Sequence, residues 1–365
     1  MTDDGADPEL LELLRQSLGL GSTGADAPPE TYVLQSAKFI YDNSVDVAID
    51  MYGTRAAAEC IWSAMSQRGY STKTWSEHEL HPKTRDEAAV NFIFTMDLLN
   101  FSFWSMRSPE ERFAVAYRDK KWTGYWSLVA ALQRAVGEEI PICTPSFWAD
   151  SEACTDQSLR HVFRSATEEE MPLLQERMEC LREAGHVLEE NFDGSIINLV
   201  KEGRGSAARL VNLLAEYFPC FRDETSFEGR KVRFLKRAQI FIADLWAAFE
   251  GKSYGSFEDI DKITMFADYR VPQMLHSIGC MSYSPPLEGH IFRERKLESG
   301  HSWEIQLRGC SIWAVELIRR EISRSHPDAY VNAILIDFFL YDAMKAIEAK
   351  KEEKIPHHRT RSIWY

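Results

Sequence analysis

The stretch FEDIDKITMFADYRVPQ, from Phe257 to Gln273, carries an aspartate at the end of an apolar run. Asp268 follows the residues ITMFA directly and comes just before the helix-like segment VPQMLHSIG. Upstream, Lys236 opens a strongly helical segment, KRAQIFIADLWAAFEG (236–251). The pattern predicts two helices joined by a turn-rich link, with an aspartate that caps the second helix.

This arrangement resembles the way in which helix-hairpin-helix DNA glycosylases present their catalytic carboxylate. The resemblance implies a glycosylase-like second half and cleavage of an N-glycosidic bond by Asp268. The chain departs from those enzymes at the glycine-rich hairpin with which they hold DNA phosphates, because RKVRFLKRAQ (230–239) contains no G-x-G. The departure argues against binding of duplex DNA.

Several longer motifs, rich in tryptophan and in the same order, resemble the queuosine salvage protein family. The similarity extends from about Ser36 to Tyr365, nearly the whole chain. The motifs are DEAAVNFIFTMDLLNFSFW (86–104), GYWSL (124–128), FADYRVPQ (266–273), RGCSIWAVELIR (308–319) and IPHHRTRSIWY (355–365).

Members of that family are N-glycosylases that release queuine from queuosine 5′-monophosphate or from the nucleoside. The resemblance therefore implies a hydrolase with this small molecule as substrate and queuine as product, working without a cofactor or a metal ion. Two alternatives stay open. One is a non-catalytic queuine- or queuosine-binding protein, in which Asp268 is a helix cap and nothing more. The other is a base-excision glycosylase of nucleic acid, which predicts a G-x-G hairpin and a basic face.

Composition places the chain among ordinary globular proteins. It has 365 residues, of which 45% are apolar and 27% charged, enough to bury a large core. No apolar run reaches the roughly 18 residues of a membrane span, and the first residues lack the features of a secretory signal. The seven cysteines are scattered and form no CxxC pair, which indicates neither a zinc site nor a disulfide framework. We expect a cytoplasmic protein, with the nucleus as a second compartment.

The formal net charge is −14. Proteins that bind DNA or tRNA usually present a basic face to the phosphates, so the charge favours a free nucleotide and argues against direct contact with nucleic acid. Part of the charge is local, because residues 1–30 contain seven acidic residues and one arginine. We expect this segment to be a disordered acidic tail with one short amphipathic helix, Pro8 to Leu20.

Helical periodicity dominates the rest of the chain and predicts a mostly α fold, with a few short strands. We expect an N-terminal helical part over 31–165 and a glycosylase-like helical part with the catalytic aspartate over 166–365. The expected helices lie at 33–44, 54–69, 109–119, 127–140, 171–192, 206–218, 236–251, 309–325 and 331–352. The expected strands lie at 101–106, 121–127 and 303–309.

Asp268 is the candidate catalytic residue. Cleavage of a ribosyl N-glycosidic bond develops oxocarbenium charge at C1′, which a nearby carboxylate stabilises, attacks or helps to hydrate. Queuine is a 7-deazaguanine, so protonation at N7 cannot assist its departure. The competing interpretation of Asp268 is a helix N-cap, and one side chain can do both jobs.

Two further candidates would contact the base. Phe266 stands two residues before Asp268 and can stack on a flat base, although a core phenylalanine is an equal alternative. His78 lies in WSEHELHP (75–82), a polar stretch between helices, where it either bonds the base or ribose or is simply solvated.

Asp337 and Asp342 lie in AILIDFFLYDAM, an otherwise apolar helix. Buried acids are costly unless they are paired or hydrogen-bonded, so both are candidate ligands for the amine, the diol or the guanine-like edge of queuine. Of the two, Asp342 is favoured. The alternative is a structural ion pair to Arg308 or Arg361.

Lys236 and Arg237 open a helix, where free N–H groups and the dipole attract anions, so they are candidates for holding a 5′-phosphate. The alternative is solvation at the surface. Asn100 belongs to the aromatic-rich motif that ends at Trp104. We expect Asn100 to contact the substrate, and most of its aromatic neighbours to belong to the core.

Overall fold

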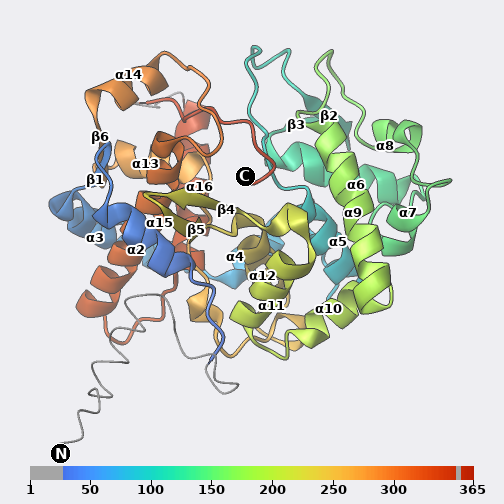
Figure 1. Ribbon diagram of the computed structural model, residues 1–365, viewed down its shortest axis with the longest axis horizontal. Helices are drawn as coiled ribbons and strands as arrows, with labels where there is room; N and C mark the ends of the chain where they lie inside the picture. Colours follow the sequence, from blue (N-terminus) through green and yellow to red (C-terminus); the bar gives the residue numbers. More distant parts are fainter. Residues whose placement is uncertain (1–27, 351–354) are drawn as a thin grey trace, which may run out of the picture. The chain divides into compact units, whose positions relative to one another are not determined.

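The computed structural model describes residues 28–350 and 355–365. Nearly all of the expected acidic tail, including the Pro8–Leu20 helix, lies outside the described residues. Thr31–Tyr365 forms one compact unit. Its elements are mainly helices, with short antiparallel strand pairs, so the mostly α prediction is confirmed (Figure 1).

The helices follow one another with short connections. In chain order they are α2 (Val33–Asp42), α3 (Met51–Arg68), α4 (Thr72–Glu77), α5 (Glu87–Leu98), α6 (Tyr125–Gly137), α7 (Pro145–Ala149), α8 (Asp156–Val162), α9 (Leu174–Phe192), α10 (Ile196–Glu202), α11 (Ala207–Tyr217), α12 (Lys236–Ala248), α13 (Arg270–Ser277), α14 (Pro285–Phe292), α15 (Ser302–Ser325) and α16 (Ala333–Lys350). Short 3₁₀ turns lie at Pro219–Phe221, Ser253–Gly255 and Ile260–Lys262.

The strands of the described residues pair two by two and antiparallel. The pairs are β1 (Val47–Ile49) with β6 (Met281–Tyr283), β2 (Ala114–Tyr117) with β3 (Lys120–Thr123), and β4 (Glu224–Phe227) with β5 (Arg230–Arg233). The β1–β6 pair aligns Val47 with Tyr283. It therefore joins two segments that are far apart in the sequence.

Several local predictions differ from the structure. The expected helix at 109–119 contains β2, and its end is a tight hairpin turn in which Arg118 and Asp119 have φ of 51° and 59°. Two consecutive residues with positive φ in a two-residue loop are typical of a tight β-hairpin turn. The stretch expected as a strand at 101–106 has no strand, and 121–127 divides between β3 and α6.

The expected strand at 303–309 lies inside α15. Its alternating pattern, WEIQLRG, comes from polar residues that are buried and satisfied. Glu304 pairs with Arg308 at 3.4 Å, and the Gln306 side-chain oxygen accepts the backbone N–H groups of Val45 and Asp46. Alternation of polar and apolar residues normally indicates a strand with one solvent-exposed face and one buried face. Here the polar and the apolar residues are both buried.

Helix α15 organises the packing of the early and late parts of the chain. It packs against α2, α3, α13 and α16. The contact with α2 requires Gly309, because a Cβ there would lie 2.5 Å from a methyl carbon of Ile40. Helices from both expected parts thus share one core, and the division at residue 165 stays a prediction.

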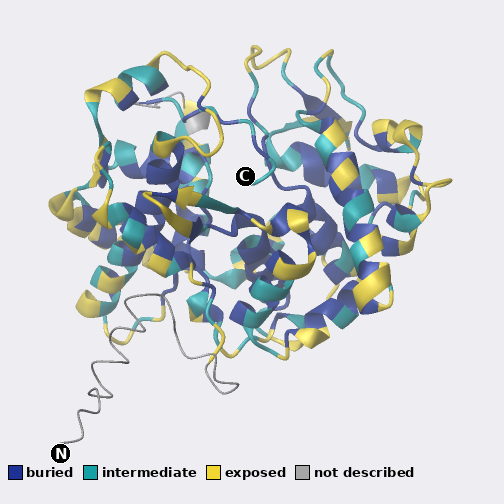
Figure 2. Cartoon of the chain, in the orientation of Figure 1, coloured by how far each residue is buried: buried dark blue, intermediate teal, exposed yellow. Residues whose placement is uncertain are grey.

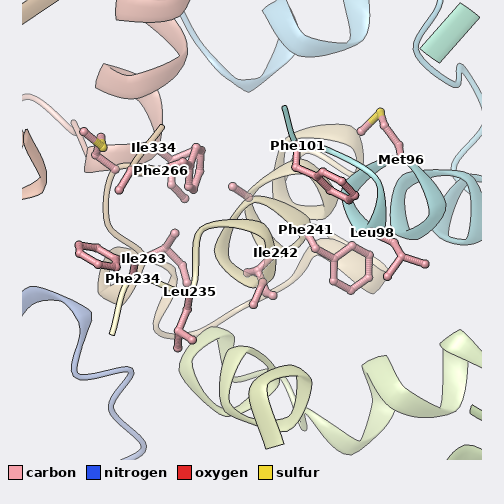
Figure 3. Packing of buried hydrophobic residues seen from close by; sticks show 14 of the residues in the cluster. Met96, Leu98, Phe101, Phe234, Leu235, Phe241, Ile242, Ile263, Phe266 and Ile334 are labelled. Carbon is pink, nitrogen blue, oxygen red and sulfur yellow. The ribbon is translucent and has the colours of Figure 1, made fainter. Parts of the chain in front are cut away.

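A second packing centre is α12, which lies against α4, α5 and α11. Figure 2 shows its ribbon largely in the colour of buried residues. Figure 3 shows Phe241 and Ile242 of this helix near Phe101 and Leu98, while Phe266 lies close to Ile334 of α16. Because α12 is held on several sides, the side chains at its start have well-defined positions.

The C-terminal segment enters between these groups of helices, where Figure 1 marks the chain end. The backbone N–H of Ser102 donates to the carbonyl of Tyr365 at 2.9 Å, and the Trp104 indole N–H donates to the carbonyl of Thr360 at 2.8 Å. No helix in the described part of the chain is both long and apolar enough to cross a membrane.

Candidate active site

A cavity of about 950 Å³ opens among α4, the start of α6, α12, α13, α16 and the C-terminal segment. Ligand pockets commonly have volumes of about 300–1,000 Å³. Apart from Arg237, every candidate site residue predicted from the sequence lines this cavity. The residues are His78, Asn100, Lys236, Phe266, Asp268, Asp337 and Asp342.

Asp268 stands at the start of α13, half-buried at the cavity wall. Its Oδ1 accepts the backbone N–H groups of Arg270 at 2.7 Å and Val271 at 3.0 Å. Both bonds and the helix dipole stabilise a negative charge at this place. The side chain therefore caps the helix and faces the cavity at the same time.

Lys236 begins α12 and is 5% exposed. Its Nζ donates to the backbone oxygen of Asn100 at 3.1 Å and to Oδ1 of the same residue at 3.4 Å. Burial lowers the pKa of the Lys236 ammonium, and the negative charge of Asp268 opposes that shift. The lysine and the aspartate are thus electrostatic neighbours on one wall.

Buried arginines hold the loop that carries Asn100. Arg177 donates to the carbonyls of Leu99 and Phe101, and Arg237 donates to the carbonyl of Leu98. Arg237 is 1% exposed and does not line the cavity. Its place in the structure does not suit the phosphate-binding role considered for it from the sequence.

Arg308 connects the segments of Lys236 and Asp268. Its guanidinium binds the carboxylate of Asp223 in a bidentate manner, at 2.6 and 3.0 Å, and its Nε donates to the carbonyl of Ala267 at 3.0 Å. Asp223 in turn accepts the backbone N–H of Lys236 at 3.2 Å. One side chain from α15 therefore holds the start of α12 beside the residue that precedes Asp268.

One alternative for Asp337 and Asp342 was an ion pair with Arg308. That alternative is wrong, because Arg308 binds Asp223 and Glu304 instead. Asp337 accepts the backbone N–H of Phe266 at 3.2 Å. Burial raises the pKa of Asp337 well above its usual value, and the charge of Asp268 adds to that effect. This favours a protonated carboxyl in the cavity wall.

The other acid of α16, Asp342, accepts a hydrogen bond from the hydroxyl of Tyr70 at 2.7 Å. Burial raises its pKa, and the bond from Tyr70 opposes the rise. The second arginine considered for these acids, Arg361, donates to the carbonyl of Ser102.

One end of the cavity is aromatic. His78 stacks on Trp126, with ring centroids 3.3 Å apart. His81 stacks on Trp75 at 3.8 Å, and its Nδ1 is 2.8 Å from the carbonyl of Trp75. A carbonyl accepts but does not donate, so Nδ1 carries the proton and Nε2 accepts from the Tyr125 hydroxyl at 2.9 Å. Burial lowers the pKa of His81 to about 3, which keeps the ring neutral.

Phe266 combines both interpretations considered for it. It is 2% exposed and packs near Phe338, with centroids 6.1 Å apart, yet it contributes to the cavity wall. Within residues 28–350 and 355–365, no group of three or more His, Cys, Asp or Glu side chains is placed to hold a metal ion.

The sequence model described as queuosine salvage protein matches residues 80–365. The chain belongs to this family. Proteins named queuosine 5′-phosphate N-glycosylase/hydrolase are similar to it over most of its length. The protein of Schizosaccharomyces pombe is 46% identical over 91% of this chain and 99% of its own length. That of Bos taurus is 43% identical over 91% and 98%, and that of Sphaerobacter thermophilus 36% over 93% and 100%.

The region that matches the queuosine salvage family contains most of the cavity residues. His78 lies just before the matched residues, together with Tyr70 and Trp75. Sequence reasoning missed Tyr70 and Asp244, which also line the cavity. Asp337 was identified because it is an acidic residue within an apolar helix. Asp244 has the same feature, which was sufficient to identify Asp244 as well. Tyr70 follows a glycine in a polar link and carries no such signal.

Proposed function

We propose that this chain hydrolyses the N-glycosidic bond of queuosine 5′-monophosphate, or of the nucleoside, and releases queuine. The observation that carries the proposal is the Asp268 carboxylate, held by two N–H donors at the wall of a cavity of nucleotide size. Relatives named for this activity cover more than nine-tenths of the chain at up to 46% identity, which supports the same substrate class.

In the proposed reaction Asp268 stabilises the positive charge that develops at C1′, attacks that carbon or orients water toward it. Its geometry is fixed before the substrate binds, so little reorganisation is needed during the reaction. Lys236 and Asn100 lie on the same wall, where an ammonium and an amide can bind the ribose or its phosphate. Arg270 and Arg359 add positive charge to the cavity lining.

The aromatic end suits the base. Phe266, His78 and Trp126 line the cavity, and the last two stack on each other; aromatic rings in a pocket wall suit the binding of a nucleobase. Asp342, with its neighbour Tyr70, offers polar atoms to the base or its diol. The proposal requires no cofactor and no metal ion.

The test of the function is direct. The purified chain is incubated with queuosine 5′-monophosphate, with and without EDTA, and free queuine is measured by chromatography. We expect release in both conditions. Recovery of intact, bound nucleotide without release would favour the non-catalytic binding protein, for which the cap bonds of Asp268 are the supporting observation.

All seven cysteines lie in the described residues and are free. This supports a reducing compartment, and we propose the cytoplasm.

Selection of the base is expected to depend on Asp342 and His78. Truncating either side chain to Ala removes a polar partner, which costs about 1–3 kcal/mol if the base is left unsatisfied. We expect a smaller preference for queuosine 5′-monophosphate over guanosine 5′-monophosphate, measured by competition. The exposed Asp328→Ala serves as the control. An unchanged preference in both variants would show that other residues select the base.

Intact tRNA is expected to be a poor substrate. The net charge of −14 repels flanking phosphates over about a Debye length. Queuosine-containing tRNA and its nuclease digest are treated with enzyme, and the queuine from each is quantified. Comparable rates would overturn the free-nucleotide proposal and support a base-flipping glycosylase.

A further inference from the structure

Helix α12 places a second acid on the face that carries Lys236. Residues 236, 240 and 244 are spaced i, i+4 and i+8, so they share one side of the helix, and all three line the cavity. The acid, Asp244, is 2% exposed. It lies about 12 Å along the helix from Lys236. A ligand whose sugar meets Lys236 and Asp268, and whose base lies along this face of α12, reaches Asp244.

A second buried carboxyl, that of Asp97, does not line the cavity but acts on Asp244 through its charge. Asp97, near the end of α5, is fully buried, and its Oδ1 is 3.4 Å from the donating Nδ2 of Asn100. Among the described residues, Oδ2 of Asp97 has no hydrogen-bond partner. A buried carboxylate oxygen without a donor is costly when it is charged. The side-chain N–H of Trp75 donates to Asp244.

Two interacting carboxyls in a buried place do not both ionise, and they titrate as a pair. Burial raises the pKa of Asp97 to about 8. Burial also raises the pKa of Asp244 well above its usual value, and the charge of Asp97 raises it further. The pair therefore keeps at least one proton at neutral pH.

Charged groups on the neighbouring elements do not change this conclusion. Lys236 attracts the negative charge of both carboxyls, and Arg237 attracts that of Asp97. Asp337 on α16 repels the charge of Asp244. Burial shifts the pKa of three further groups near the pair in the direction of the neutral form: His81, Tyr125 and Tyr341.

We propose that Asp244 is the general acid of the reaction, which protonates the departing base while Asp268 acts at the sugar. The assignment depends on the proposed function. The bond from C1′ to the base nitrogen breaks, and its electron pair passes into the base. Asp244 gives its proton to a ring nitrogen or carbonyl oxygen conjugated with that nitrogen, so the base leaves neutral. Water adds to C1′, and its proton returns through Asp268 and solvent to restore Asp244.

The chemistry of the base explains why such an acid is needed. A 7-deazaguanine has carbon at position 7 and cannot accept a proton there, and a charged base is a poor leaving group. General acids contribute about 100- to 10,000-fold to a rate when they are well placed. Asp97 acts through Asp244 and is a positioning residue, because Asp97 is the first of the two to ionise and its charge then holds the last proton of the pair on Asp244.

The test compares Asp244→Asn, Asp268→Asn and the wild type on two substrates. Queuosine 5′-monophosphate requires protonation of its leaving group, whereas 4-nitrophenyl β-ribofuranoside 5′-phosphate loses a stable phenolate. We expect Asp244→Asn to lower kcat about 100-fold on the first substrate with little change in KM, and to leave the second nearly unaffected. Asp268→Asn is expected to lower kcat strongly on both substrates. Equal losses of Asp244→Asn on the two substrates would overturn the assignment.

The pH profile is a second measurement, independent of the nitrophenyl substrate. The acid must be protonated, so wild-type kcat falls as pH rises through the second ionisation of the pair, that of Asp244. Asp97→Asn removes a like charge and lowers the pKa of Asp244, so the fall moves to lower pH. An unmoved profile would overturn the role of the pair. Asp46→Asn, a half-buried carboxylate that accepts from Ser284 outside the cavity, is the control.

The outcomes separate the two proposals. If the wild type releases no queuine, the proposed function fails and the general acid fails with it. If the wild type releases queuine and Asp244→Asn retains its kcat, the general acid alone fails. Circular dichroism and thermal unfolding of each variant check that the isosteric amides leave the fold intact.

Discussion

Asp268→Asn is expected to reduce the release of queuine by about 100-fold or more, because it removes a charge that acts on the transition state. The amide keeps the size of the side chain, and its oxygen still accepts the N–H groups of Arg270 and Val271. The cap of α13 therefore survives the substitution. Turnover is measured by chromatography, with circular dichroism on the same sample.

A matched control is Asp259→Asn. Asp259 is also half-buried and caps a helix, because its carboxylate accepts from Ser206 and from the backbone N–H of Ala207. It does not line the cavity, so we expect near-native turnover. If Asp268→Asn retained turnover close to that of Asp259→Asn, Asp268 would be a helix cap and not a catalytic residue.

Arg308→Met is expected to destabilise the fold by about 3–5 kcal/mol, the usual cost of leaving a buried partner unpaired. The substitution leaves Asp223 and Glu304 buried without their cation. It also releases the carbonyl of Ala267 and loosens the start of α12. We therefore expect a fall in kcat of about 10-fold or more in the protein that remains folded, since small displacements of catalytic groups are costly.

Arg320→Met on the same helix provides the comparison. Arg320 is 52% exposed and pairs with Glu316 at 2.6 Å. Glu316 also binds Arg319 at 2.8 Å, so it keeps a cationic partner in the variant, and the loss of the exposed arginine is expected to cost about 0–1 kcal/mol. Urea unfolding gives the free energy of unfolding of each variant. The kcat values are measured at urea concentrations well below the unfolding transition. Similar stability and similar kcat in the two variants would refute a structural role for Arg308 beyond that of a surface arginine.

The sequence alone predicted most of the long helices and the chemical character of the site. The helices at 33–44, 54–69, 171–192 and 206–218 were expected and are present within a few residues. Their apolar residues recur with helical spacing, and that signal is local to each segment. The motifs at 86–104, 124–128, 266–273, 308–319 and 355–365 indicated the family, which the comparison confirms. The predicted site residues line one cavity, and their roles stay predictions.

Tertiary structure decided which distant groups meet. WEIQLRG alternates like a strand, yet it is helical because Glu304, Gln306 and Arg308 find buried partners in other elements. The link from Arg308 through Asp223 to Lys236 joins three separate segments. Helical periodicity depends on residues three or four apart, so it can be recognised from a short stretch of sequence. The partner of a buried charge depends on which elements pack together, and only the folded chain determines that.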